Sequence, residues 1–257
     1  MPSVTSPDGT RIAYTRTGSG PTLILVDGAM CYRAAGPLQP LAAALEDSFT
    51  VYTYDRRGRG ESTDTQPYAV AREIEDLQAL VAETGGEAYV YGISSGAALA
   101  LATAEVTPAI TKLALYEPPF IAASENPAAT TEYATHLNEL LAAGRKGAAI
   151  AHFMTNVGVP QQMIATLRTQ PAWPVLEAIA HTLAYDAEIL GDGRIPTLNI
   201  TIPTLVMSGS ASPHTLQQAA KALAATLPTA THQSLPNQTH DVNPQVLTTP
   251  LKTFLAQ

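Results

Sequence analysis

Short apolar, β-prone runs alternate with helix-like stretches along most of this chain, and this alternation limits the folds that it can adopt. The runs lie at 22–26, 49–54, 88–91, 113–116 and 204–207. Runs of this kind are typical of strands buried on both faces of a parallel sheet. The stretches between most of them are helix-like and lie at 36–46, 69–84, 96–105 and 213–226. The alternation predicts βαβ units and a mostly parallel, doubly wound sheet of the α/β class.

The alternation stops between residues 122 and 200. Helix-like stretches fill this segment at 129–143, 146–156, 160–169 and 174–190. Because the sheet takes its last strands from beyond the segment, we interpret it as an inserted helical cap, in preference to a separate helical domain. The expected organisation is a core over 1–121 and 201–257 and a cap over 122–200. Asp8-Gly9, a turn dipeptide between two β-prone runs, predicts an antiparallel hairpin ahead of the parallel strands.

The composition argues against several kinds of partner. The chain has 257 residues, of which 46% are hydrophobic and 14% charged, enough apolar content for a large core. Its formal net charge is -8 and it has no run of Lys or Arg, so we expect no nucleic-acid partner. It has no signal-peptide pattern and no apolar run near the ~18 residues of a membrane span, which predicts a cytoplasmic protein without a membrane partner. The one cysteine, Cys31, cannot form an internal disulfide, which fits a reducing compartment.

The segment Gly92-Ile93-Ser94-Ser95-Gly96 has the spacing G-x-S-x-G, directly after a predicted strand and directly before a helix of small residues. In that context the motif places a nucleophilic serine on a strained strand-to-helix turn, whose neighbours two residues away must be small. Ser94 is favoured over Ser95 because only Ser94 has glycine at both positions. The alternative is a Gly/Ser-rich turn without chemistry, which the flanking strand and helix make the weaker interpretation.

A serine needs an adjacent base to act as a nucleophile at neutral pH. His240 lies in a polar loop that follows a final short strand and precedes the C-terminal helix, where the base for such a serine is expected. The other histidines fall in the cap segment or around the helix at 213–226, where a surface or structural role is favoured: His136, His152, His181, His214 and His232.

The imidazole in turn needs a carboxylate for its second nitrogen. The usual position, after the strand at 204–207, lies in the segment 208–213, which contains no carboxylate. Glu117 instead follows the strand at 113–116, at the sheet edge where active sites assemble. We therefore favour Glu117, with Asp241 and a water-linked Ser212 as alternatives.

The negative oxygen of a reaction intermediate requires two backbone N–H donors. Ser95 is expected to supply one, and Gly28 or Ala29, after the strand at 22–26, the other. Asp27 either orients this loop or contacts the substrate. Further candidate contacts are the apolar or aromatic residues of this loop and the cap, namely Met30, Phe153, Met154, Met163, Trp173 and Tyr185. No ligand cluster is present, so we expect no metal and no organic cofactor.

Together these motifs resemble the α/β-hydrolase family over essentially the whole chain. The segment 54–62 is similar to that family's D-x-R-G-x-G-x-S turn, which is structural there. The core motifs also resemble the zearalenone lactone hydrolases, which share Asp27-Gly28, the Ser-Ser-Gly turn, a glutamate at the position of Glu117 and small residues at 211–213. That resemblance implies a triad of Ser94, Glu117 and His240. It does not extend to residues 122–200, so it implies a mechanism rather than a substrate.

The sequence therefore predicts an α/β-hydrolase-fold enzyme that hydrolyses a small, apolar carboxylic ester or lactone through an acyl-enzyme. Hydrolysis of a carbon–carbon bond is an alternative within the same class, and a β-diketone substrate distinguishes it from ester hydrolysis. A ligand-binding protein without activity is an alternative from another class, supported by the missing aspartate. A fluorophosphonate probe, which labels activated serines, distinguishes that alternative. The sequence does not indicate an oligomeric state.

Overall fold

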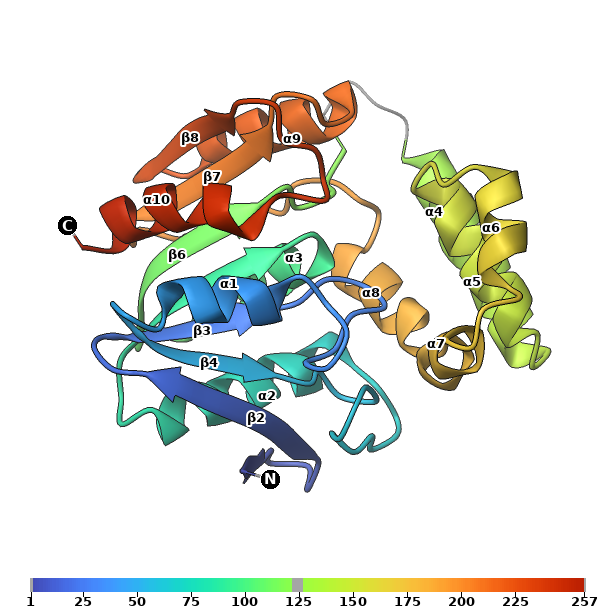
Figure 1. Cartoon of the computed structure of the whole chain (residues 1–257), viewed down its shortest axis with the longest axis horizontal. Coiled ribbons are helices and arrows are strands. Elements are labelled where there is room, and N and C mark those ends of the chain that lie inside the picture. The colour runs from blue at the N-terminus through green and yellow to red at the C-terminus, as the bar shows by residue number, and fades with distance from the viewer. Residues whose placement is uncertain (1, 122–126, 257) are drawn as a thin grey trace.

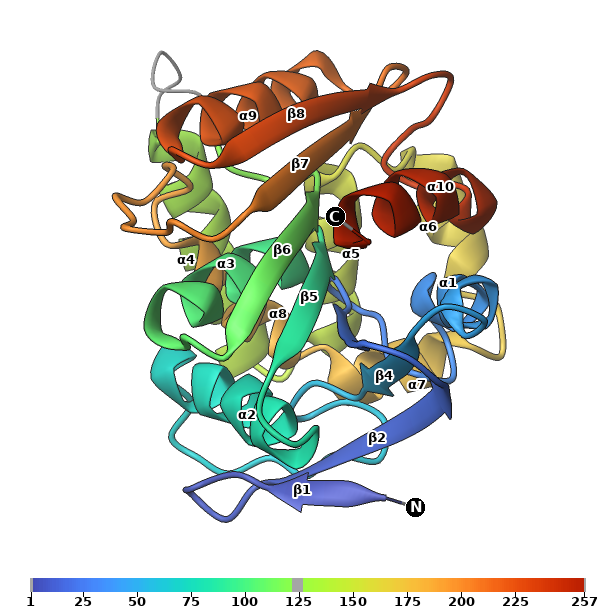
Figure 2. The same ribbon diagram turned by 90° about the vertical axis from the view of Figure 1, so that its left-hand side faces the viewer.

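An eight-stranded sheet forms the centre of the molecule in the computed structural model, which describes residues 2–121 and 127–256 (Figures 1 and 2). The strand order is β1-β2-β4-β3-β5-β6-β7-β8. The strands are β1 (Ser3–Thr5), β2 (Arg11–Gly18), β3 (Thr22–Val26), β4 (Thr50–Tyr54), β5 (Ala88–Ile93), β6 (Ile110–Tyr116), β7 (Thr204–Gly209) and β8 (Ala230–Leu235). β2 is antiparallel to β1 and β4, and the other pairs are parallel. The predicted mostly parallel sheet and the N-terminal hairpin are confirmed.

Helices cover both faces of the sheet. The core helices are α1 (Leu38–Leu45), α2 (Val70–Glu83), α3 (Ser95–Val106), α9 (His214–Thr226) and α10 (Pro244–Leu255). α1 and α10 pack together on one face, while α2, α3 and α9 cover the other (Figure 2). Successive residues of a strand point to opposite faces of the sheet. In β3, Leu23 and Leu25 therefore join the apolar core under α1 and α10, whereas Ile24 and Val26 join the core under α2, α3 and α9. This two-sided burial explains why the strands are continuous apolar runs.

A helical insertion separates β6 from β7. Its helices are α4 (Ala128–Ala142), α5 (Lys146–Asn156), α6 (Gln161–Leu167), α7 (Trp173–Ile179) and α8 (Thr182–Leu190). Figure 1 shows α4, α5 and α6 standing away from the sheet, whereas α8 runs back against α3 of the core. Within the described residues, no helix is long and apolar enough to cross a bilayer.

One predicted helix of the insertion was wrong: the stretch 174–190 forms two helices, α7 and α8. The chain tightens where they meet, because Leu183 N–H bonds the carbonyl of Ala180, three residues back, at 3.1 Å. The Thr182 hydroxyl donates to the Ile179 carbonyl at 2.8 Å. A hydroxyl that bonds a carbonyl of the preceding turn competes with the regular helical pattern, which accounts for the break.

The carboxyl ends of the parallel strands line one edge of the sheet. The strand order reverses between β3 and β5. Ligands bind at such switch points in open α/β sheets. The four positive-φ non-glycine residues of the described chain all lie in loops at this edge: Met30 (60°), Ser94 (56°), Glu117 (45°) and Asn237 (57°). Backbone strain of this kind concentrates at functional sites, which points to this edge of the sheet.

Candidate active site

Ser94 occupies the sharp turn between β5 and α3, with φ 56° and ψ -130°. Its N–H donates to the Tyr116 carbonyl of the adjacent strand at 2.9 Å. A side chain at Gly92 would meet the Gly96 carbonyl oxygen at 2.5 Å, and one at Gly96 would meet the Val26 carbonyl oxygen at 2.5 Å. Glycine is therefore required at both positions, and the turn presents Ser94 at the edge of the sheet.

Glu117 and His240 lie side by side, although they are 123 residues apart in sequence. The distance from Glu117 Oε2 to His240 Nδ1 is 2.8 Å, and Glu117 Oε1 accepts the Gly209 N–H at 2.7 Å. The Glu117 side chain is fully buried, while that of His240 is 40% exposed. A buried carboxylate that accepts from Nδ1 leaves Nε2 as the nitrogen available to a reacting group.

The loop that carries His240 is held against the ends of β6 and β7. The Tyr116 hydroxyl donates to the Thr239 carbonyl at 2.6 Å, and Ala211 N–H donates to the Gln238 carbonyl at 2.9 Å. A Cβ at Gly209 would overlap the Gln238 carbonyl, so the end of β7 has no room for a side chain there. Tyr116, the last residue of β6, contacts this loop, and Glu117, which follows it directly, contacts the imidazole.

Ser94 faces the loop that follows β3. A Cβ placed on Gly28 would lie 3.0 Å from the Ser94 Cβ and 3.6 Å from its hydroxyl oxygen. In the described part of the chain no hydrogen bond joins the Ser94 hydroxyl to His240. Such contacts are often long without substrate and tighten when it binds.

The backbone amides around Ser94 differ in their availability. Gly28 N–H donates to the carboxylate of its neighbour Asp27 at 3.1 Å, so it is already engaged. Among the described residues, the amides of Ala29 and Ser95 have no acceptor. The Ala29 and Ser95 amides are therefore free N–H donors near Ser94, whereas the Gly28 amide is not.

Asp27 is only 3% exposed and orients the loop after β3 through the Gly28 amide. Burial raises the pKa of Asp27 to about 7, although the Gly28 N–H and the charges of Arg59 and Arg56 act in the opposite direction. The sequence left two roles open for Asp27, orienting the loop or contacting the substrate. The hydrogen bond with the Gly28 N–H fits the first of these roles.

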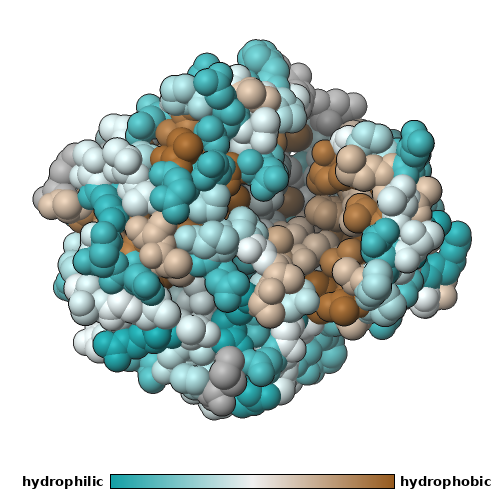
Figure 3. All heavy atoms as spheres, in the orientation of Figure 1, coloured by the Kyte–Doolittle hydropathy of each residue, from teal (hydrophilic) through white to brown (hydrophobic). Residues whose placement is uncertain are grey.

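Most of the candidate substrate contacts belong to one apolar cluster under the insertion. It includes Met30, Trp173, Phe153 and Met154, packed with buried residues of α4, α5 and α8. Figure 3 shows hydrophobic surface gathered around the hollow between the core and the insertion. Met163 is 55% exposed and is not in this cluster.

Tyr185 lies apart from that cluster. Its ring stacks on Tyr68 with ring centroids 3.7 Å apart, and its hydroxyl donates to Asp64 at 2.7 Å. These partners lie in the loop before α2, so Tyr185 fastens α8 to the core. Another histidine is also engaged elsewhere, because His232 on β8 pairs with the Ser208 hydroxyl at 3.0 Å.

Sequence reasoning missed a buried charged cluster formed by Arg56, Arg59 and Asp186. It lies beside the nucleophile elbow, which is the turn that carries Ser94. The Asp186 carboxylate pairs with Arg56 Nη1 and with Arg59 Nη2, each at 2.8 Å, and accepts from the Ser95 hydroxyl at 2.7 Å. Burial acts to raise the pKa of Asp186, but the charges of Arg59 and Arg56 hold it below its ordinary value. The available signal was the density of arginine in the segment 56–59, since buried arginines need carboxylate partners.

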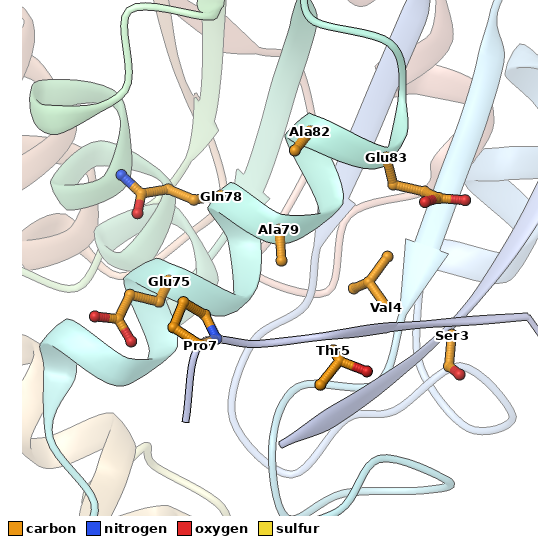
Figure 4. A pocket seen from close by; sticks show the side chains of 9 residues that line it. All are labelled: Ser3, Val4, Thr5, Pro7, Glu75, Gln78, Ala79, Ala82 and Glu83. Carbon is orange, nitrogen blue, oxygen red and sulfur yellow. The ribbon is translucent and has the colours of Figure 1, made fainter. Parts of the chain in front are cut away.

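A groove far from the elbow lies between β1 and α2 and has a volume of about 730 Å³ (Figure 4). Its Glu83 carboxylate already accepts from the Tyr14 hydroxyl at 2.7 Å. Four strand spacings separate β1 from β5, or roughly 19 Å. The residues that line this groove include no histidine beside a hydroxyl or thiol, so we place the candidate site at Ser94.

Comparison with known proteins shows similarity over nearly the full length of this chain. The Alpha/beta hydrolase family matches residues 18–249. A solved alpha/beta hydrolase from Sphaerobacter thermophilus is 49% identical, with a TM-score of 0.90 over 99% of this chain and 100% of that one. The enol-lactonase from Burkholderia xenovorans is 22% identical over 100% of both chains, with a TM-score of 0.74, and shares the fold. The uncharacterized hydrolase YraK from Bacillus subtilis is 38% identical over 97 residues, which cover 36% of this chain and only 35% of that protein.

Proposed function

Since the chain belongs to the alpha/beta hydrolase family, we propose that it hydrolyses a carboxylic ester or lactone through a covalent acyl-enzyme formed on Ser94. The observation that carries the proposal is the contact of 2.8 Å between buried Glu117 and His240, at the sheet edge where Ser94 is presented. A binding protein has no need of a serine in a strained turn together with a paired imidazole.

The proposed reaction uses three side chains and two amides. His240 Nε2 removes the proton from Ser94, whose oxygen attacks the substrate carbonyl carbon. The Ala29 and Ser95 amides stabilise the resulting oxyanion, and Glu117 stabilises the imidazolium. His240 then returns the proton to the leaving alkoxide. A water molecule deprotonated by His240 then attacks the acyl-enzyme carbonyl, and His240 gives this proton to the Ser94 oxygen as the carboxylic acid leaves.

The proposed substrate class is apolar. The cluster formed by Met30 and the insertion supplies apolar side chains next to the Ala29 amide, and Ala29 itself packs against that cluster. Burial of an acyl chain contributes roughly 0.8 kcal/mol per CH₂ group, whereas an unpaired charge there would lose its hydration. The similarity of the core motifs to the zearalenone lactone hydrolases supports the proposed roles of Ser94, Glu117 and His240, and both esters and lactones fit that mechanism.

The test is labelling of the intact protein by a fluorophosphonate probe, followed by ester turnover. We expect labelling of wild type, loss of labelling in Ser94→Ala, and hydrolysis of p-nitrophenyl butyrate that depends on Ser94. A protein that is folded but neither labelled nor active would refute the proposal in favour of a ligand-binding role. Faster cleavage of a β-diketone than of esters would refute it in favour of carbon–carbon hydrolysis.

A further inference from the structure

We infer that Arg59 and Asp186 are positioning residues of the oxyanion hole, through which helix α8 of the insertion sets the direction of the Ala29 amide and the place of Ser95. This inference rests on the proposed function. Neither side chain is required to touch substrate. Their effect passes through the backbone units that flank Ser94.

The first link runs from Arg59 to the loop after β3. Arg59 Nη1 donates to the Gly28 carbonyl at 2.6 Å. The Gly28 carbonyl and the Ala29 N–H belong to one peptide unit, and in a trans peptide these groups point in opposite directions. By holding the carbonyl on its own side, Arg59 turns the Ala29 N–H to the other side of the peptide plane. A cationic donor on the carbonyl also polarises the unit, which strengthens its N–H as a donor.

The second link runs from Asp186 to the start of α3. Asp186 Oδ1 accepts from the Ser95 hydroxyl at 2.7 Å, and Ser95 is only 2% exposed. The Ser95 amide is the other free donor of the site. The single carboxylate of Asp186 therefore holds both halves of the hole, one through Arg59 and one through Ser95.

Further hydrogen bonds and an ion pair tie the Arg56, Arg59 and Asp186 cluster to its surroundings. Arg56 joins it by donating to the Asp27 carbonyl at 3.2 Å, and pairs with Glu73 at 2.6 Å. Arg59 Nε donates to the Thr182 hydroxyl at 3.1 Å, which adds a second tie to α8. Because donors preorganised for the transition state act on the chemical step, loosening this cluster should lower kcat rather than raise KM.

Arg57 and Asp76 provide a matched control within the same loop region. This pair is equally buried, with Arg57 Nε 2.7 Å from Asp76 Oδ2, but its other partners are Asp8 and the Arg72 carbonyl, away from Ser94. Asp186→Asn and Asp76→Asn each remove one buried negative charge, which in Asp186 pairs with two arginines and in Asp76 with one. The Asp76 variant therefore controls for the loss of a buried charge away from Ser94, and only the Asp186 variant should affect catalysis.

The experiment measures kcat, KM and the Ki of an alkyl boronic acid, whose tetrahedral serine adduct places an oxygen in the hole. For Asp186→Asn we expect kcat to fall by about 10- to 100-fold, less than the loss of a whole oxyanion donor. KM should stay within about threefold, and the boronate Ki should rise in step with the fall in kcat. Asp76→Asn should change none of the three beyond about threefold. Ser95→Ala, which leaves every charge paired, should lower kcat by about 3- to 10-fold with KM unchanged.

Two outcomes would overturn this inference without affecting the proposed function. In one, Asp186→Asn and Ser95→Ala have the same kcat as Asp76→Asn. In the other, these variants have a raised KM and an unchanged kcat. If Asp186→Asn does not fold, the Ser95→Ala result decides. A wild-type protein without Ser94-dependent turnover would overturn the proposed function and this inference with it, so the two failures are told apart by the wild-type measurement.

Discussion

Replacing Glu117 by glutamine tests the site most directly, because the surroundings of this side chain leave the amide no good orientation. Glu117 Oε1 accepts the Gly209 N–H at 2.7 Å, and Oε2 faces His240 Nδ1 at 2.8 Å. If the glutamine oxygen keeps the Gly209 contact, its NH₂ group faces Nδ1 and forces the proton onto Nε2. If the amide turns over, the NH₂ group opposes the buried Gly209 N–H, which leaves both donors without an acceptor.

The first orientation holds the imidazole in the tautomer that cannot accept a proton from Ser94, and both orientations remove the charge that stabilises the imidazolium. A triad aspartate changed to asparagine costs roughly 10⁴-fold in kcat by this tautomer effect. We therefore expect Glu117→Gln to lower kcat/KM for p-nitrophenyl butyrate by about 10²- to 10⁴-fold, or roughly 3 to 5.5 kcal/mol of transition-state stabilisation. Folding should change little, since the residue keeps its size.

The control is Asp241→Asn, because Asp241 is exposed and adjacent in sequence to His240. Its kcat/KM should stay within about threefold of wild type, as expected for a surface change away from the reacting groups. A Glu117→Gln variant near the wild-type rate, with Asp241→Asn inactive, would contradict the assignment of the acid. Circular dichroism on both variants separates loss of activity from loss of fold.

Three further predictions follow from the same geometry. Ser94→Ala should lose at least about 10³-fold in kcat, whereas Ser95→Ala should keep a measurable rate within tenfold of wild type; the reverse order of these rates would show that the elbow register is shifted. Because burial raises the pKa of Asp27 to about 7, the folded protein keeps a proton that the unfolded chain releases near pH 4. The free energy of unfolding should therefore fall as the pH rises between these two values, by up to roughly 4 kcal/mol. Asp27→Asn should flatten that slope, as measured by urea midpoints at pH 5 and 8, and equal slopes in both proteins would contradict the argument. Apolar p-nitrophenyl esters should exceed negatively charged hemisuccinate esters by about tenfold or more in kcat/KM, consistent with the cost of burying a charge; a preference for the charged esters would contradict an apolar pocket.

Local rules in the sequence determined the parts of this protein that depend on neighbouring residues. Apolar runs predicted the strands because both faces of β3 and its neighbours are buried. The spacing of Gly92 and Gly96 predicted the elbow because any Cβ there meets backbone. The segment after β7 contains no carboxylate, which favoured Glu117, after β6, as the partner of the imidazole. These inferences need only periodicity, steric size and the order of elements.

The tertiary structure alone decided the contacts between distant segments. Asp186 lies 91 residues from Ser95 and 127 from Arg59, and no local pattern marks such partners. The structure also assigned the Gly28 amide to Asp27, turned Tyr185 toward Tyr68, and divided the predicted helix at 174–190. Each of these outcomes follows from how buried charges and hydrogen-bonding groups find partners once the chain is packed. Which partner a buried group finds depends on which segments the sheet brings together. The sequence of any single segment therefore does not reveal the partner.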